Sequence, residues 1–170
     1  MFEALRQSDA TWKVIVNEVP IAQLFVDPYD RWEGYAAERK EILDFIRTSG
    51  MRNVVFITGD LHGNIITDVR RDTFTDATPI AKEFIAGPIA QVTFADQLAA
   101  SPDSERTANG LPTPLGPLVL PDCANLSTFA YGLVEVDSAT KRLTVTLKND
   151  AGQAFCSATL LPSGLRPRQD

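Results

Sequence analysis

The chain has 170 residues, of which 44% are hydrophobic, and this length suits a single domain with a substantial core. Its 16 Lys and Arg against 22 Asp and Glu give a net charge of −6, which argues against a protein that tracks the phosphate backbone of nucleic acid. It contains no run of about 20 apolar residues, so the sequence predicts no transmembrane segment.

The first residues lack the basic flank and apolar stretch of a secretory signal peptide, and the sequence leaves the localisation open. Cys123 and Cys156 lie far apart in the sequence and do not form a metal-binding pair. Two cysteines in a chain of this length do not indicate a disulfide scaffold, and their redox state stays open.

The first 60 residues alternate between strand and helix patterns. We expect a short helix at residues 2–6, a strand at 12–16, a helix from Tyr35 that stops at Gly50, and a strand at 53–58. This order predicts a βαβ unit with parallel strands. The residues expected on one face of the second helix are Tyr35, Arg39, Ile42, Leu43 and Ile46.

The pattern weakens after Gly63, and only one further strand is expected before residue 100, at residues 80–85. Residues 101–122 hold five prolines and two glycines, which predicts a long Pro-rich loop. The last third contains three strand patterns joined by turn-rich segments, and the tail at 162–170 is expected to be flexible. An antiparallel meander is the natural result, with strands at residues 131–136, 143–147 and 154–160.

The segment Gly-Asp-Leu-His-Gly at residues 59–63 ends an apolar strand and contains His62, the only histidine. Polar side chains that follow such a strand in an α/β sheet collect into sites. In extended geometry Asp60 and His62 would share a face, as two ligands of a metal site. The alternative is turn chemistry, with the aspartate bonding local backbone and the histidine making an ordinary hydrogen bond.

A second cluster, at residues 27–35, mixes carboxylates with aromatic side chains ahead of the expected helix. Asp30 is a candidate metal ligand or orienting group, while the alternative is helix capping by Asp27, Asp30 or Glu33 with Trp32 in the core. Glu83 lies inside an apolar strand pattern. It is either paired on a solvated face, for example with Lys82, or buried near the site.

Taken in order, these segments resemble the PhoD-like alkaline phosphatases (alkaline phosphatase D), a family of metallophosphoesterases. The pieces that carry the resemblance are Trp-Lys-Val-Ile at 12–15, Asp-x-Trp-x-Gly-Tyr-x-x-x-Arg at 30–39, the strand and Gly-Asp-Leu-His at 53–62, Glu-Phe at 83–84, and Tyr-Gly-Leu-Val-Glu-Val at 131–136.

The resemblance implies an α/β/β/α sandwich, hydrolysis of phosphate monoesters or diesters, and a metal cluster that holds iron, with calcium in some members. It implies that Asp60 and His62 bind metal or contact substrate, that Asp30 lies near the same site, and that Arg39 is a structural helix residue.

The metal-binding segments that the family carries in its N-terminal half, of the types Gly-Asp-x-x-Asp/Tyr and Asn-His-Asp/Glu, do not occur here. We therefore interpret residues 1–161 as the C-terminal half of such a domain, and expect the isolated chain to be inactive or nearly so. A competing interpretation is a non-catalytic half-domain that dimerises or binds a partner chain, such as a complementing N-terminal half.

Overall fold

The computed structural model describes residues 1–24, 31–73, 75–100 and 121–163. These residues form a mixed α/β fold with two sheets. The elements in chain order are α1 (Phe2–Gln7), β1 (Lys13–Asn17), α2 (Ala36–Thr48), β2 (Val54–Thr58), β3 (Asn64–Val69), β4 (Ala81–Ile85), α3 (Phe94–Ala100), β5 (Cys123–Asn125), β6 (Ala130–Val136), β7 (Leu143–Asn149) and β8 (Ala154–Leu160).

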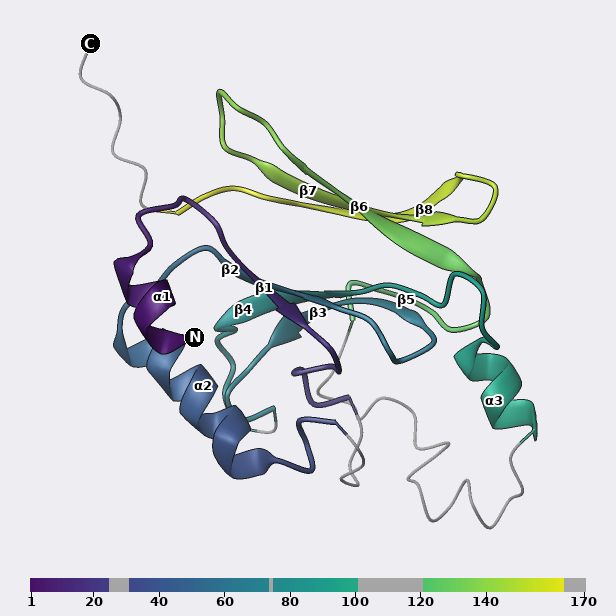
Figure 1. Ribbon diagram of the computed structural model, residues 1–170, viewed down its shortest axis with the longest axis horizontal. Helices are drawn as coiled ribbons and strands as arrows, with labels where there is room; N and C mark the ends of the chain where they lie inside the picture. The colour runs from purple at the N-terminus through teal and green to yellow at the C-terminus, as the bar shows by residue number, and fades with distance from the viewer. Residues whose placement is uncertain (25–30, 74, 101–120, 164–170) are drawn as a thin grey trace.

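The elements stack in layers, with α1 and α2 on one face of a five-stranded sheet and a three-stranded sheet on its other face (Figure 1). The larger sheet has the strand order β1-β2-β4-β3-β5, and the smaller has the order β6-β7-β8. In the part of the chain that the structure describes, no helix covers the outer face of the smaller sheet (Figure 1).

The predicted βαβ unit is confirmed, because β1 pairs with β2 in parallel and α2 connects them. Helix α2 buries Arg39, Leu43 and Ile46, which follow one another at helical spacing as the sequence predicted. Tyr35 precedes the helix and is exposed, so its expected place on the buried face is wrong. The chain leaves α2 through Gly50, whose φ of +66° lies in the left-handed region.

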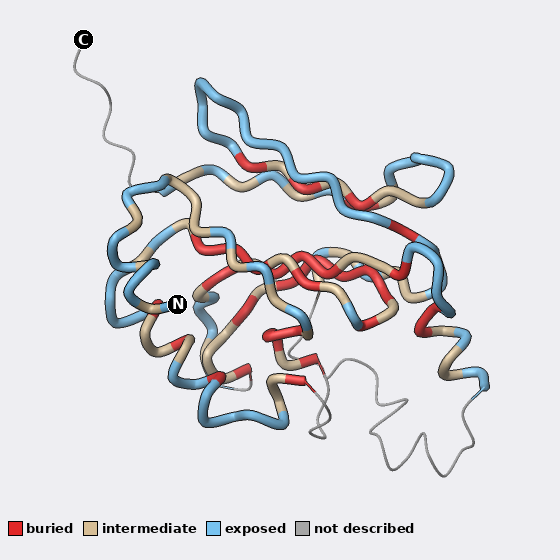
Figure 2. Tube along the Cα trace, viewed as in Figure 1, coloured by how far each residue is buried: buried red, intermediate tan, exposed pale blue. Residues whose placement is uncertain are grey.

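The core has two parts, one on each face of the larger sheet, and its buried residues concentrate along that sheet (Figure 2). Strand β2 serves both parts, because Val54 and Phe56 face the helices while Val55 faces the smaller sheet. This double burial explains why β2 reads as a continuous apolar run rather than an alternating one.

The predicted meander is confirmed by the antiparallel pairing of β6 with β7 and of β7 with β8. In β7, Leu143, Val145 and Leu147 are buried and alternate with more exposed polar residues. A disulfide joins Cys123 of β5 to Cys156 of β8, and it therefore connects the two sheets. The sequence had left the redox state of these cysteines open.

Strands β3 and β5 and helix α3 were not predicted, since the pattern after Gly63 appeared weak. Strand β3 lies between β4 and β5 and is buried over almost its whole length. Most of the predicted Pro-rich loop at 101–122 and of the tail at 162–170 lies outside the described residues.

Candidate functional site

The loop at residues 59–63 joins the end of β2 to the start of β3. Strands β1, β2 and β4 are mutually parallel, so their carboxyl ends meet at this edge of the sheet. Asp60 and His62 both have φ close to +60°, in the left-handed region. The extended geometry expected between them is therefore wrong, and the two side chains are placed by a compact turn instead.

His62 is held by a segment that follows it by about thirty residues. Its Nδ1 lies 2.8 Å from the carbonyl oxygen of Val92, and its own carbonyl accepts a 2.7 Å hydrogen bond from the N–H of Phe94. A carbonyl can only accept, so the Nδ1–H tautomer satisfies this contact and leaves the lone pair on Nε2. The side-chain amide nitrogen of Gln97 lies 2.8 Å from the same Nδ1, so the Nδ1–H tautomer requires this amide to be turned by 180°, with its oxygen in place of the nitrogen.

This hydrogen bond is the arrangement that commonly orients a metal-binding histidine, in which one ring nitrogen donates to a carbonyl and the other faces the ligand. Sequence reasoning did not identify Val92 and Gln97 as the groups that hold His62. Nothing local signals the contact, because 30 and 35 residues separate them from His62.

Asp60 is exposed at the tip of the same turn, two residues beyond the end of β2. Within residues 1–24, 31–73, 75–100 and 121–163, no group of three or more His, Cys, Asp or Glu side chains is placed to hold a metal ion. Asp30, the third expected ligand, lies outside the described residues. The assignment of these three residues as metal ligands stays a prediction.

The turn is fixed on its other side by Gly63 and Asn64. A Cβ on Gly63 would lie 2.6 Å from Cδ2 of Leu126, so glycine allows a close approach between the turn and the segment after β5. Asn64 is buried, donates to the carbonyls of Asn125 and Thr128, and accepts from the N–H of Gly87. Its amide is thus occupied by backbone groups.

Glu83 is fully buried at the centre of β4, on the sheet face that carries the helices. Its carboxylate accepts hydrogen bonds from the N–H groups of Ile21 and Ala22 at 3.0 and 2.7 Å, and from the Thr58 hydroxyl at 2.6 Å. Burial raises the pKa of Glu83, while these donors and the charge of Arg39 oppose that rise.

Of the two interpretations of Glu83, the pairing with Lys82 on a solvated face is wrong. Lys82 bonds instead to Asp68 at 2.7 Å and to Asp122 at 2.5 Å. The hydrogen bonds that Glu83 accepts from Ile21 and Ala22 hold the segment that follows β1. The hydrogen bond that it accepts from Thr58 reaches the end of β2, two residues before Asp60.

Arg39 completes this buried network from α2. Its guanidinium donates to the carbonyls of Ile21, Arg71 and Arg70 at 2.6, 3.0 and 2.8 Å. Burial lowers the pKa of Arg39, against the charges of Glu33 and Glu83. These contacts agree with the structural role that the sequence resemblance implied for this arginine.

Of the residues 27–35, Trp32 packs against the helix-side core and donates to the side chain of Asn17 at 3.2 Å. Glu33 accepts from Arg31 and from the N–H of Leu24 rather than capping α2. The described part of this cluster therefore has the structural role, while Asp27 and Asp30 lie outside the described residues.

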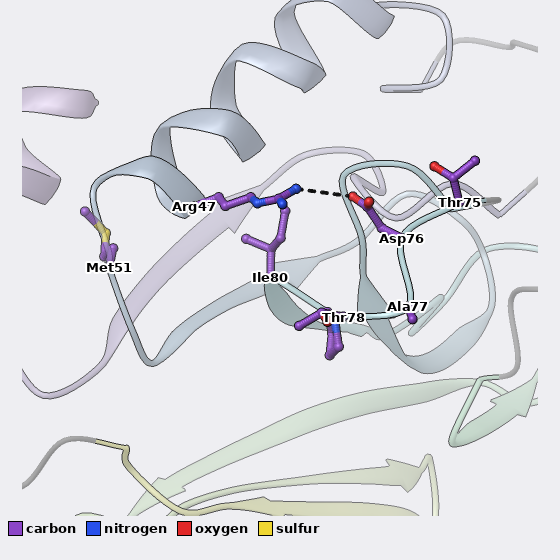
Figure 3. A pocket seen from close by; sticks show the side chains of 8 residues that line it. Arg47, Met51, Thr75, Asp76, Ala77, Thr78 and Ile80 are labelled. Atoms are coloured by element: carbon purple, nitrogen blue, oxygen red, sulfur yellow. Dashed lines mark ion pairs between the residues drawn. The ribbon is translucent and has the colours of Figure 1, made fainter.

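A pocket of about 380 Å³ lies between the end of α2 and the segment before β4, where Arg47 pairs with Asp76 at 3.7 Å (Figure 3). It sits at the amino ends of β2 and β4, since Met51 and Ile80 precede those strands. Asp60 and His62 follow the carboxyl end of β2, so this pocket is not part of their site.

Chemically, the turn offers one exposed carboxylate and one oriented imidazole with an available Nε2. Two such groups can start a metal site but do not complete one of the zinc type, in which the catalytic metal takes three protein ligands. None of the helices that the structure describes is both long and apolar enough to cross a bilayer.

Comparisons with known proteins agree with the resemblance seen in the sequence. Alkaline phosphatase D of Bacillus subtilis (strain 168) is 29% identical over 79 residues, which cover 42% of this chain and 14% of that protein. A solved structure titled "Structure of PhoD" superposes on 95% of this chain with a TM-score of 0.68 and 18% identity, and the chain spans 32% of its length. A sequence model described as PhoD-like phosphatase matches residues 1–147, so the chain belongs to the PhoD-like phosphatase family.

Proposed function

We propose that this chain is the part of a metal-dependent phosphoesterase that contributes the ligands Asp60 and His62. The observation that supports this proposal most directly is the 2.8 Å contact between His62 Nδ1 and the Val92 carbonyl oxygen, which in the Nδ1–H tautomer leaves Nε2 available. Membership of the PhoD-like phosphatase family supports phosphoesterase chemistry in general.

In this proposal Asp60 holds a metal ion through a carboxylate oxygen. His62 binds the metal through Nε2, or stabilises the phosphoryl oxygens and the leaving group. Asp30 is proposed as a further ligand or orienting group. The metal ions, iron and calcium by resemblance, would supply an activated water and neutralise the phosphoryl charge. The substrate is a phosphate monoester or diester, as a small molecule or a polymer.

The proposed ligands are tested through the single imidazole of the chain. Because His62 is the only histidine, its ring ¹⁵N signals need no assignment, and long-range ¹H–¹⁵N spectra report its tautomer directly. We expect the Nδ1–H form, and selective broadening of Nε2 by millimolar Mn²⁺, which serves as a paramagnetic probe with a preference for oxygen and imidazole ligands.

Asp60→Asn should weaken that broadening at least several-fold, because it removes the neighbouring carboxylate. Glu135→Gln is the matched control, since it removes an exposed carboxylate on β6 and should leave the broadening unchanged. An Nε2–H tautomer, or a signal that Mn²⁺ broadens equally in the Asp60→Asn variant, would remove the pair from consideration as ligands.

Catalysis is tested by hydrolysis of p-nitrophenyl phosphate and bis(p-nitrophenyl) phosphate, with the longest natural polypeptide that contains these residues. We expect Asp60→Asn and His62→Ala to lower turnover by 100-fold or more, and the 170-residue chain alone to show little or no activity. Wild-type rates in both variants would exclude these residues from the mechanism.

A second candidate function is a non-catalytic half-domain that dimerises or binds a partner chain. The observation that favours it is the absence of a complete set of metal ligands among residues 1–24, 31–73, 75–100 and 121–163. A monomeric chain that binds stoichiometric metal and hydrolyses phosphate esters would exclude this alternative.

A further inference from the structure

The ring of His62 is held by a segment outside its own turn. Residues 87–97 join β4 to the first turn of α3, and we call them the support segment. They place the Val92 carbonyl 2.8 Å from Nδ1, and their Phe94 N–H donates to the His62 carbonyl at 2.7 Å. Because the Val92 carbonyl can only accept a hydrogen bond, its position decides which ring nitrogen carries the proton and which keeps its lone pair.

The start of the support segment is anchored through its backbone. The Gly87 N–H donates to the side-chain oxygen of Asn64 at 3.1 Å, and the Pro88 carbonyl accepts from the N–H of Ala130 at 2.9 Å. Residues 89–92 follow with exposed side chains. Within this chain, the carbonyl that contacts the ring is therefore placed by these backbone anchors rather than by the packing of its own side chain.

Asn64 also holds the residues that anchor the other end of the support segment. Its side-chain N–H groups donate to the carbonyls of Asn125 and Thr128 at 3.3 and 2.9 Å. Between those two residues lies Leu126, whose carbonyl accepts from the N–H of Ala95 in the support segment at 2.9 Å. One amide therefore joins the turn that carries the imidazole to the anchors at both ends of the support segment.

The chemistry of asparagine suits this position. Backbone carbonyls only accept and backbone N–H groups only donate, so two carbonyls and one N–H fix the orientation of the Asn64 amide. Asn64 is fully buried two residues after His62, and its oxygen and both its N–H groups are used. An alanine at this position would lose all three hydrogen bonds.

We propose that Asn64 is a positioning residue for His62, which fixes the support segment so that the imidazole takes the Nδ1–H form and keeps Nε2 available. The consequence for catalysis rests on the proposed function, whereas the positioning itself can be measured without a metal ion. A residue with a purely structural role would lower stability and leave the ring unchanged, so the ring signals separate the two roles.

Long-range ¹H–¹⁵N spectra of the ring at pH 8.5, which favours neutral imidazole, test this proposal. We expect the Nδ1–H form in the wild-type chain. In Asn64→Ala we expect Nε2–H to become the major form, because the Val92 carbonyl is no longer held at the ring. Val145→Ala is the matched control, since it truncates a buried side chain between the two sheets. It should lower the melting temperature and leave the ring signals unchanged.

Amide hydrogen exchange in the wild-type chain is a second measurement, and it decides the matter if circular dichroism shows that Asn64→Ala does not fold. We expect the Gly87 and Ala95 N–H groups to exchange about 100-fold or more slowly than in an unstructured peptide, because both donate to the anchors. A Gly87 N–H that exchanges as fast as in such a peptide would overturn the proposal.

Broadening by Mn²⁺ distinguishes this inference from the proposed function. If both are correct, the selective broadening of Nε2 should fall several-fold in Asn64→Ala. A change of tautomer in Asn64→Ala, in a chain whose Nε2 is not broadened by Mn²⁺, would support the positioning and contradict the metal role. Broadening in the wild type with unchanged ring signals in folded Asn64→Ala would support the metal role and overturn the positioning.

Two further results would overturn the proposal. One is an Nε2–H ring in the wild-type chain. The other is the same change of tautomer in Val145→Ala as in Asn64→Ala, which would mean that the ring follows general stability rather than this amide.

Discussion

The buried carboxylate of Glu83 gives the sharpest test of how the fold holds the end of β2. In Glu83→Gln an amide replaces the carboxylate with almost the same shape. The amide has one oxygen, which can accept from Ile21 and Thr58, but its NH₂ group then faces the N–H of Ala22, which donated to Oε2 at 2.7 Å. One donor is left unsatisfied in the core.

This loss sets the expected magnitude. An unsatisfied buried donor costs about 1–3 kcal/mol. We expect Glu83→Gln to lower the free energy of unfolding by about 2–3 kcal/mol at pH 7. For a chain of this size, that change lowers the melting temperature by about 4–10 °C.

The pH dependence separates this mechanism from a simple packing defect. The pKa of Glu83 in the folded chain is raised above its usual value of 4.5, so the folded state holds the proton more tightly than the unfolded state. Its contribution to stability is complete below pH 4.5 and is lost as the pH rises through the folded pKa. The glutamine variant has no such loss, so the stability difference between the two proteins should narrow as the pH rises.

Urea unfolding followed by circular dichroism between pH 4.5 and 8 measures both quantities. Glu135→Gln is the control, because this exposed carboxylate lies on β6, and its replacement should change stability by no more than about 0.5 kcal/mol. A cost below about 0.5 kcal/mol for Glu83→Gln throughout this range, or a difference that widens with pH, would refute the reasoning.

The remaining predictions concern the other groups that tie the layers together. Reducing the disulfide between Cys123 and Cys156, which are 33 residues apart, should lower stability by about 3–4 kcal/mol on the chain-entropy account. Urea midpoints with and without reductant measure this loss. The variant with Cys123→Ser and Cys156→Ser should have the same midpoint as the reduced protein, and reductant should not change it. Arg39→Lys should cost about 2–3 kcal/mol, because one ammonium cannot reach all three carbonyls that the guanidinium contacts. Thermal unfolding measures this loss, and Lys40→Arg on the exposed face of α2 should leave the melting temperature unchanged.

The sequence predicts elements well where one periodicity dominates. The spacing of Arg39, Leu43 and Ile46 marks the buried face of α2, and the alternation in 143–148 marks β7. The sequence does not predict strand β3, because Asn64–Val69 lies between β4 and β5 and is buried on both faces. Such a strand shows no alternation of apolar and polar residues. Its assignment depends on pairings that are distant in sequence.

The candidate site was likewise predictable only where the signal in the sequence is local. The turn after β2 is evident from Gly-Asp and from the apolar run before it. The residues that pack against this turn are Leu126, which lies close to Gly63, and Val92, which contacts His62, and neither is near it in sequence. The left-handed backbone of Asp60 and His62 was not predicted. Glu83 remained ambiguous for a similar reason, since its partners Ile21 and Ala22 lie 62 and 61 residues away.

Thr58 shows how the buried carboxylate is linked to the turn that carries Asp60. Its hydroxyl donates to Glu83 at 2.6 Å, and its carbonyl accepts from the N–H of Ala86. Thr58→Val replaces the hydroxyl with a methyl group and keeps the shape of the side chain. Because that hydrogen bond lowers the pKa of Glu83, its loss should raise the folded pKa further, and the cost of Thr58→Val should be larger at pH 8 than at pH 4.5. In the Glu83→Gln background this pH dependence should vanish, since no carboxylate remains to titrate. A double-mutant cycle at the two pH values measures the coupling, which we expect to be about 1–2 kcal/mol at pH 8. An equal cost of Thr58→Val at both pH values would mean that the hydroxyl does not stabilise the charged carboxylate.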